Sequence, residues 1–330
     1  MALTLDSSAI FQGNEGQFHI FSYVSTKGHT LIDRELYLPL KWLQDRERCL
    51  QAGIPEAVRF STKCELARLM MERLYDAQIP IDWVVADTVY GNNLDLRTWL
   101  EDHHYSFALA VACTEQIGIM TAEGRKLVTV TQAEHLLVTE QDWQQFSVKT
   151  GTKGPLLFDW TCVPILYRWE NDGQHWVLIR RIPNKPTEKT YYLVYAPLGT
   201  TLESMAWAVG RRWCIEEEFE NAKEMGLDHY EVRSFVGWYR HITLVLLALA
   251  VLTMICATER VRSNTCSVAE TNQATPSPIS LTVPEVRRLL GRLLFLLPRS
   301  TGSVLAWSWW RRCQQARASV SHAKHRLNSS

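Results

Sequence analysis

The sequence lacks an excess of charge of either sign. Its 330 residues hold 35 Lys and Arg against 35 Asp and Glu, so the formal net charge is zero. A neutral chain has no overall attraction for a polyanion, and any binding of nucleic acid must come from local basic patches. The eight cysteines are widely scattered and form no Cys-x2-Cys pair. This excludes a zinc ribbon and, with no signal peptide at Met1, argues against a secreted disulfide framework; we expect a reducing cytoplasm.

A long apolar run is also missing. The most hydrophobic stretch, Ile242 to Ala257, has sixteen residues and is interrupted by Thr243 and Thr253. About 20 apolar residues are needed to cross a bilayer. The run therefore predicts a buried core helix and no membrane partner, and a membrane-associated helical protein is the rival interpretation.

A charged stretch with an ordered arrangement is present at residues 210–230, GRRWCIEEEFENAKEMGLDHY. On a helix, Arg212, Glu216, Phe219 and Lys223 fall on one narrow face, because they are four, three and four residues apart. Glu216 is the carboxylate that lies between two cations. The stretch is thus more ordered than a merely charged helix.

An amphipathic surface helix with ion pairs one turn apart is the ordinary interpretation, and each pair would contribute about 0.2–0.5 kcal/mol. Glu218 falls on another face, together with Ile215 and Ala222.

A second acidic motif favours a catalytic interpretation. In IDWVVADTVYG, at residues 81–91, a short apolar strand ends at Asp87. An acid at the end of a strand together with an acid on a later helix is an arrangement that holds divalent metal for phosphodiester chemistry. We therefore predict Asp87 and Glu216 as metal ligands for Mg²⁺ or Mn²⁺, which accept hard oxygen ligands.

The charged stretch and its continuation HYEVRSFVGWYRHITL resemble the DDE transposases of bacterial insertion sequences. The similarity is to the branch with a Tyr-x2-Arg-x3-Glu-x6-Lys signature and a β-rich insertion. Arg212, Glu216 and Lys223 match this signature, whereas Val209 stands where it has Tyr. The resemblance implies an enzyme that cleaves and transfers DNA strands at insertion-sequence ends, with transposon-end and target duplexes as partners, and a homodimer.

The resemblance also implies a third acid, an Asp that ends the first strand of the fold. The family's Asp-Thr-Gly type of segment is not visible, and Asp6, at the end of ALTLD, is the candidate. The other possibility is an N-terminally truncated transposase, an inactive relic that only binds DNA. Asp33 and Glu35 lie within a predicted strand, and we interpret them as structural.

The order of expected elements is that of an α/β protein. Alternation predicts a hairpin with strands at residues 17–25 and 29–38. Thr62 followed by Glu65 predicts a capped helix. A strand to Asp87, a helix at residues 94–103 and a strand at residues 105–112 follow, and these elements form a mixed sheet with flanking helices. The resemblance implies a ribonuclease H-like fold.

The predicted organisation has five parts. They are a first core part at residues 1–112, a β-rich insertion at 113–200, a second core part with the Glu216 helix at 201–258, a flexible linker at 259–280 and a basic helical C-terminal region at 281–330. The insertion carries Lys149, Lys153, Arg180 and Arg181, which either position a DNA strand or are solvated hairpin charges.

The C-terminal region is rich in arginine and tryptophan, as in WSWWRRCQQAR. A DNA backbone contact through Arg311 and Arg312 and a mere basic tail both fit this composition. Further candidates for DNA contacts are Arg212, Lys223, Tyr230, Arg233 and Tyr239. The expected location is the bacterial cytoplasm, with association to the nucleoid when DNA is bound.

Overall fold

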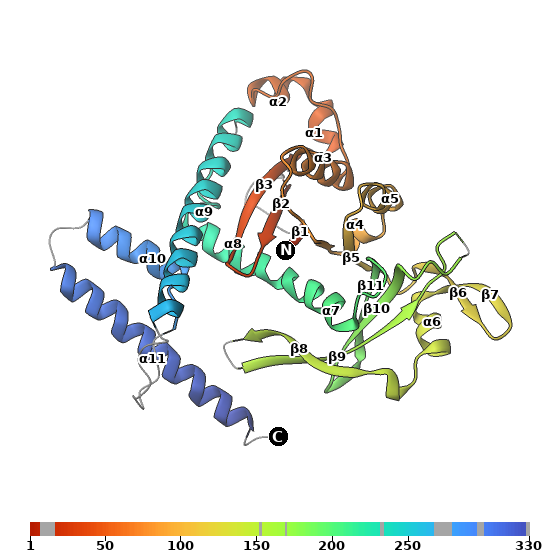
Figure 1. Cartoon of the computed structure of the whole chain (residues 1–330). Coiled ribbons are helices and arrows are strands. Elements are labelled where there is room, and N and C mark those ends of the chain that lie inside the picture. The colour runs from red at the N-terminus through yellow and green to blue at the C-terminus, as the bar shows by residue number, and fades with distance from the viewer. Residues whose placement is uncertain are drawn as a thin grey trace.

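A computed structural model of the chain describes residues 1–6, 17–151, 154–168, 170–231, 234–266, 279–295 and 300–327. Its main feature is a mixed sheet of nine strands in the order β3-β2-β1-β4-β5-β11-β10-β9-β8 (Figure 1). The first five strands along the chain are β1 (Ala2–Asp6), β2 (Gln17–Val24), β3 (His29–Tyr37), β4 (Trp83–Ala86) and β5 (Ser106–Val111).

The half of the sheet formed by β1 to β5 combines antiparallel and parallel pairs. β1 is antiparallel to β2 and parallel to β4, and β4 is parallel to β5. β1 thus lies between β2 and β4, with a hydrogen-bonded neighbour on each side. The mixed α/β prediction is confirmed, and the arrangement is compatible with a ribonuclease H-like fold.

The predicted β-rich segment extends this sheet. β11 (Lys185–Tyr195) pairs with β5, and β10 (His175–Ile182), β9 (Gly154–Pro164) and β8 (Gln144–Gly151) follow in order. A separate hairpin is formed by β6 (Gln116–Thr121) and β7 (Gly124–Thr129), followed by α6 (Val130–Leu137) and the short turn η1 (Glu140–Asp142).

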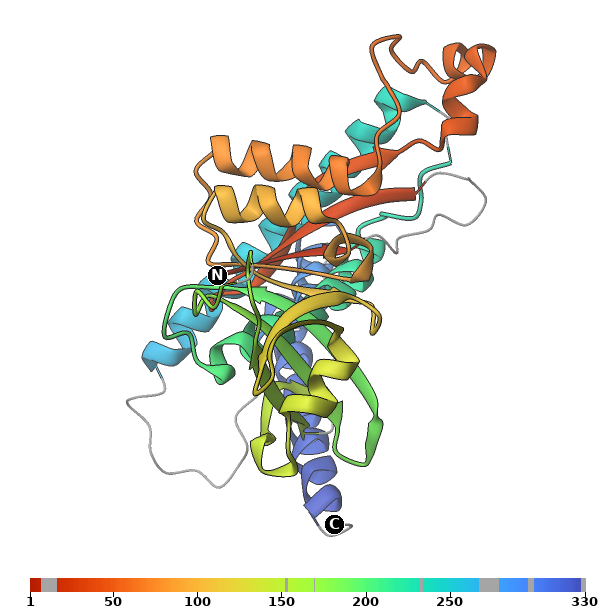
Figure 2. The same ribbon diagram turned by 90° about the vertical axis from the view of Figure 1, so that its right-hand side faces the viewer.

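Helices cover both faces of the core sheet (Figure 2). On one face, α3 (Lys63–Asp76), α4 (Thr88–Gly91) and α5 (Leu94–Asp102) enclose a core that includes Phe21, Met70 and Leu109. On the other face lie α7 (Leu202–Gly210), η2 (Arg211–Trp213), α8 (Cys214–Glu224) and α9 (Phe235–Cys266). The short α1 (Leu40–Gln44) and α2 (Arg46–Gln51) follow β3.

The predicted N-cap of α3 is confirmed. The Thr62 hydroxyl accepts from the backbone N–H of Glu65, and the Glu65 carboxylate accepts from the backbone N–H of Thr62. Reciprocal bonds of this kind satisfy two N–H groups that a helix start otherwise leaves unpaired.

The apolar run at residues 242–257 lies within α9, which is long and apolar enough to cross a bilayer by length and composition. Core helices of soluble proteins pass the same test. Ile242, Val245 and Leu249 of α9 are buried against the sheet face of β2 and β3, whereas Leu244 and Leu247 are exposed. The helix is therefore a core element along one side only.

α9 also continues to Cys266, through the first part of the segment predicted as a linker. The chain becomes polar after the apolar run, but polar residues such as Glu259 and Arg260 are good helix formers. The helix therefore continues beyond the apolar run. Residues 267–278 lie outside the described residues. The C-terminal region then forms α10 (Val283–Leu290), η3 (Gly291–Phe295) and α11 (Thr301–Leu327).

Candidate active site

Two aspartates lie at the same end of neighbouring strands: Asp6 is the last residue of β1, and Asp87 directly follows β4. In the parallel pair of β1 and β4, Leu5 lies opposite Ala86. The next residue of each segment is Asp6 and Asp87, so the backbone places these two predicted site residues side by side. Carboxyl ends of adjacent parallel strands are a common location of ligand sites in α/β sheets.

Asp87 is held by the turn that it begins. It is the N-cap of α4, and its Oδ1 accepts from the backbone N–H of Val89 at 2.9 Å. At the other end of α4, a Cβ on Gly91 would meet the carbonyl oxygen of Ala110 at 1.9 Å. Only glycine permits this close approach, so the turn is fixed against β5 and Asp87 with it.

A buried pair behind this turn connects α4 to β2. The Nδ1 atom of His19 lies 2.6 Å from the hydroxyl of Tyr90, and both residues are fully buried. Burial lowers the pKa of His19 to about 4, and the charge of Lys63 adds to this effect. The hydrogen bond between the neutral imidazole and the Tyr90 hydroxyl ties the α4 turn to the sheet.

The depressed pKa of His19 predicts a loss of stability in acid. The unfolded chain binds a proton at about pH 6.5, whereas the folded chain binds it only near pH 4. The folded state therefore loses stability as the pH falls from 6.5 toward 4, by up to roughly 3 kcal/mol. We expect denaturant titrations of His19→Gln to show a smaller loss over this window. His135→Gln, which removes an exposed histidine on α6, is the control, and an equal acid loss in wild type and His19→Gln would contradict the prediction.

The segment that carries Glu216 begins beside the same strands. η2 packs against β1 and β4, and α8 follows it and packs on β2 and β3. Arg212 of η2 lies 3.9 Å from Glu216, measured from Nη2 to Oε1. Burial raises the pKa of the Tyr192 phenol. Arg212 lies close enough to Tyr192 for its positive charge to oppose this rise. Tyr192 is paired with Ala110, near the strand end where Asp87 is located.

The helix that carries Glu216 is shorter than the sequence pattern indicates. The pattern suggests one helix from Gly210 to Tyr230, but α7 ends at Gly210, η2 intervenes and α8 ends at Glu224. Gly226 has φ +92°, a conformation that ends helices and favours glycine. Lys223 is exposed near the end of α8, and Val209 is buried in the core against the sheet.

Glu218 is a buried carboxylate of α8 that the sequence interpretation missed. Its carboxylate is buried beneath α8, and Oε1 lies 2.9 Å from Nδ1 of His29 at the start of β3. Burial raises the pKa of Glu218, and the bond to His29 opposes this rise. The only signal in the sequence was that Glu218 shares a helix face with Ile215 and Ala222, both of which are buried.

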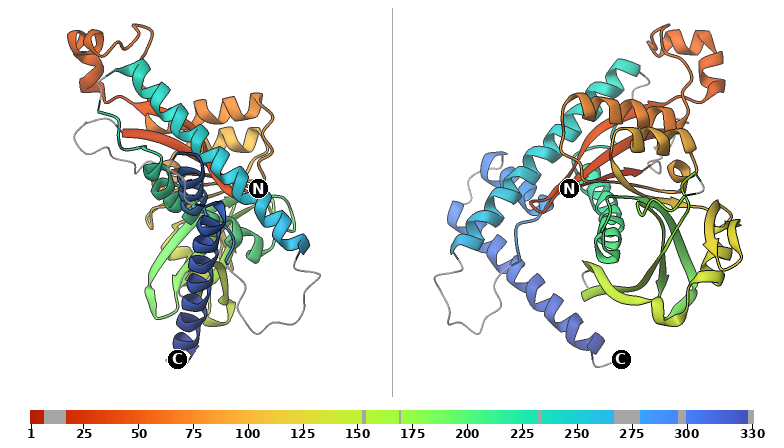
Figure 3. Two further views of the ribbon diagram at one scale, coloured as in Figure 1. Left: turned by 90° about the vertical axis from the view of Figure 1, so that its left-hand side faces the viewer. Right: turned by 45° about the vertical axis from the view of Figure 1, so that its right-hand side comes forward.

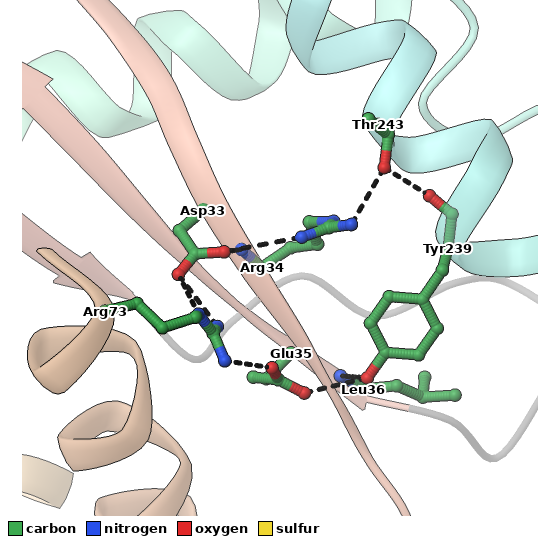
Figure 4. Close-up of polar contacts among 7 residues, drawn as sticks. All are labelled: Asp33, Arg34, Glu35, Leu36, Arg73, Tyr239 and Thr243. Carbon is green, nitrogen blue, oxygen red and sulfur yellow. Dashed lines mark hydrogen bonds and ion pairs between the residues drawn. The ribbon is translucent and has the colours of Figure 1, made fainter. Parts of the chain in front are cut away.

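Tyr239, predicted to contact DNA, lies in an internal network (Figure 4). Its hydroxyl donates to Glu35 at 2.7 Å, and burial with the charge of Glu35 raises its pKa. Arg73 of α3 donates to Glu35 and to Asp33, each at 2.7 Å. The network joins α3, β3 and α9, which agrees with a structural role for the two acids. Arg34 extends it to Thr243.

The remaining DNA-contact candidates differ in their surroundings. The Tyr230 hydroxyl donates to the backbone carbonyl of Ser234 at 2.8 Å. Arg233 lies outside the described residues. Arg311 packs over Trp307, with 5.6 Å from the guanidinium carbon to the ring centre. Arg312 donates to the backbone carbonyl of Ile279 at 2.6 Å, and burial lowers its pKa.

The donor set suits a hard divalent cation. Carboxylate oxygens are the ligands that Mg²⁺ and Mn²⁺ accept. Asp6 and Asp87 are two carboxylate residues at the ends of paired strands. Within the part of the chain that the structure describes, no group of three or more His, Cys, Asp or Glu side chains is close enough to hold a metal. The side chain of Asp6 lies outside the described part of the chain.

A mixed core sheet with acids at the ends of two adjacent strands, and an acidic helix on one face of this sheet, is compatible with a ribonuclease H-like fold. Comparison with protein families agrees: residues 7–154 match the family model of the DDE superfamily endonucleases. The resemblance to DDE transposases is confirmed at this level. The matched part contains Asp87, whereas Asp6 and Glu216 lie outside it. No curated protein matches the chain.

Proposed function

We propose that this protein is a transposase that cleaves DNA at insertion-sequence ends and joins the ends to target DNA. The pairing of β1 with β4 carries the proposal, because it puts Asp6 and Asp87 next to each other at the strand ends. The match to DDE superfamily endonucleases supports the same chemistry.

Asp6, Asp87 and Glu216 are the proposed ligands of Mg²⁺ or Mn²⁺. When bound, such ions neutralise the charge that develops on the phosphate oxygens during an in-line displacement. Arg212 places a positive charge 3.9 Å from the Glu216 carboxylate. Lys223, two turns further along, is exposed and is our candidate for a contact to a DNA phosphate, as are Tyr230 and Arg233.

The reaction comprises two displacements at phosphorus. In the first, water attacks a phosphodiester, the bond to the 3′ oxygen breaks and a free 3′ hydroxyl and a 5′ phosphate are left. In the second, this hydroxyl attacks a phosphodiester of the target and displaces its 3′ oxygen. The site acts in the cytoplasm on double-stranded DNA, and a homodimer would bring two transposon ends together.

The direct test is a nicking assay with Mg²⁺ on duplex DNA that contains the transposon end. We expect the wild-type chain to cut it and Asp6→Asn to lose cleavage by about 10³-fold, because a lost ligand removes several kcal/mol of charge stabilisation. Asp95→Asn, on the exposed surface of α5, is the control and should cut normally.

Three outcomes distinguish the alternatives. DNA binding without nicking by the wild-type chain supports the inactive, DNA-binding relic. Full cleavage by Asp6→Asn shows that another acid completes the site. Absence of DNA binding by the wild-type chain contradicts both forms of the proposal.

A further inference from the structure

The C-terminal helices lie beside α9 (Figure 3). They enclose a cleft that the proposed active site does not use. It lies between α10 with η3 and the first turns of α11, with Leu252 of α9 at its base, and has a volume of about 630 Å³. Its basic and aromatic lining residues are Arg287, Arg288, Arg292, Arg311 and Trp307.

The charged residues of this cleft are mainly basic, and most of the remaining lining is apolar. Among the described residues that line it are four arginines and one acid, Glu285. Glu285 is buried and pairs with Arg311 of α11 and with Arg288 of α10, the latter at 3.5 Å. One carboxylate thus holds guanidinium groups from two helices in place, and the wall keeps a net positive charge.

The cleft is continuous with the catalytic helix. Arg287 of α10 donates to Glu224 of α8 at 2.7 Å, and Glu224 follows Lys223 directly. α10 also packs on both α8 and α9. A polyanion that reaches the exposed side of α8 therefore meets these arginines next.

We propose that this cleft binds the phosphodiester backbone of duplex DNA adjacent to the cleaved bond. The inference rests on the proposed function and adds a second contact region to it. Guanidinium groups bind phosphates through two parallel hydrogen bonds, and a carboxylate that fixes them reduces the entropy lost on binding. Arg288 and Arg292 are exposed and line the cleft, whereas Glu285 acts as a positioning residue.

Removal of two of these charges tests the proposal. We expect the double variant Arg288→Gln/Arg292→Gln to bind end-containing duplex about tenfold more weakly at 0.1 M salt. The slope of log affinity against log salt should fall by about 2, because each lost phosphate contact removes close to one released counterion. Fluorescence anisotropy of a labelled duplex measures both quantities on the full chain.

The matched control is Arg68→Gln/Arg125→Gln. It removes two exposed arginines, one on α3 and one on β7, and should leave the slope unchanged. An unchanged slope in Arg288→Gln/Arg292→Gln, with nicking by the wild-type chain intact, overturns the cleft and leaves the proposed function standing. If the wild-type chain binds no DNA, the proposed function itself fails.

A third experiment tests whether the cleft binds a different polyanion. Vesicles of phosphatidylglycerol replace the duplex in a sedimentation assay. Loss of vesicle binding by Arg288→Gln/Arg292→Gln, with DNA binding retained, assigns the cleft to lipid headgroups and overturns the proposal.

Discussion

Replacing Glu216 by glutamine is expected to lower Mg²⁺-dependent DNA cleavage by about 10³-fold or more, while DNA binding changes little. The substitution keeps the size of the side chain and removes the charge that a divalent cation needs. A loss of this size corresponds to about 4 kcal/mol of transition-state stabilisation, the scale on which metal ions act. The measurement is single-turnover nicking of end-containing duplex, with anisotropy for binding.

Glu220→Gln is the matched control for this variant. It removes an exposed carboxylate from the same helix, four residues further on, and should cut at the wild-type rate. Equal cleavage by wild type and Glu216→Gln would show that α8 does not supply the third acid. A Glu216→Gln protein that no longer binds DNA would indicate a role in binding.

Replacing Glu218 by alanine should destabilise the fold by about 3 kcal/mol. The substitution leaves the His29 imidazole without its buried partner, and breaking such a pair typically costs 3–5 kcal/mol. Because part of the His29 side chain is exposed, we expect a loss of unfolding free energy near the lower end of that range. The shift of the urea midpoint gives the change in unfolding free energy.

Neighbouring Glu217 provides the comparison. Its carboxylate lies 3.8 Å from Nε2 of His29, but more than half of its side chain is exposed. Water screens such pairs, so Glu217→Ala should change stability by no more than about 0.5–1 kcal/mol. If Glu218→Ala and Glu217→Ala lower the unfolding free energy equally, the buried bond between α8 and β3 contributes no more stability than a surface ion pair. Glu218→Gln, which keeps an acceptor for His29, should recover part of the loss.

Local patterns in the sequence predict much of the core. The hairpin of β2 and β3 follows from alternation across the turn near Gly28, and α3 follows from Thr62 and Glu65. Both signals operate over a few residues, where side-chain period and capping decide the structure. The break between α7 and α8 was not predicted, because packing of η2 against β1 and β4 overrides a continuous helical pattern.

The same distinction between local and distant signals applies to the residues of the candidate site and its surroundings. Asp87 and Glu216 are visible because each lies in a recognisable local motif. The bond of Glu218 to His29 joins residues 189 positions apart, and that of His19 to Tyr90 joins residues 71 apart. A single sequence holds no signal for such pairs, since only the folded sheet brings them together. Glu35, the partner of Tyr239, is also far from it in the sequence. The sequence alone therefore could not distinguish a contact of Tyr239 with DNA from an internal hydrogen bond.

The position of β1 has a consequence for synthesis on the ribosome. This strand is translated well before β4, yet Leu3 pairs with Val84 of β4, which leaves the exit tunnel only after α3 has been made. Until then the nascent chain can form the hairpin of β2 and β3 with β1 at its edge, and one side of β1 remains open to other chains. Rapid translation of the segment up to β4, or protection by a chaperone that binds extended apolar segments, would therefore favour correct folding over aggregation.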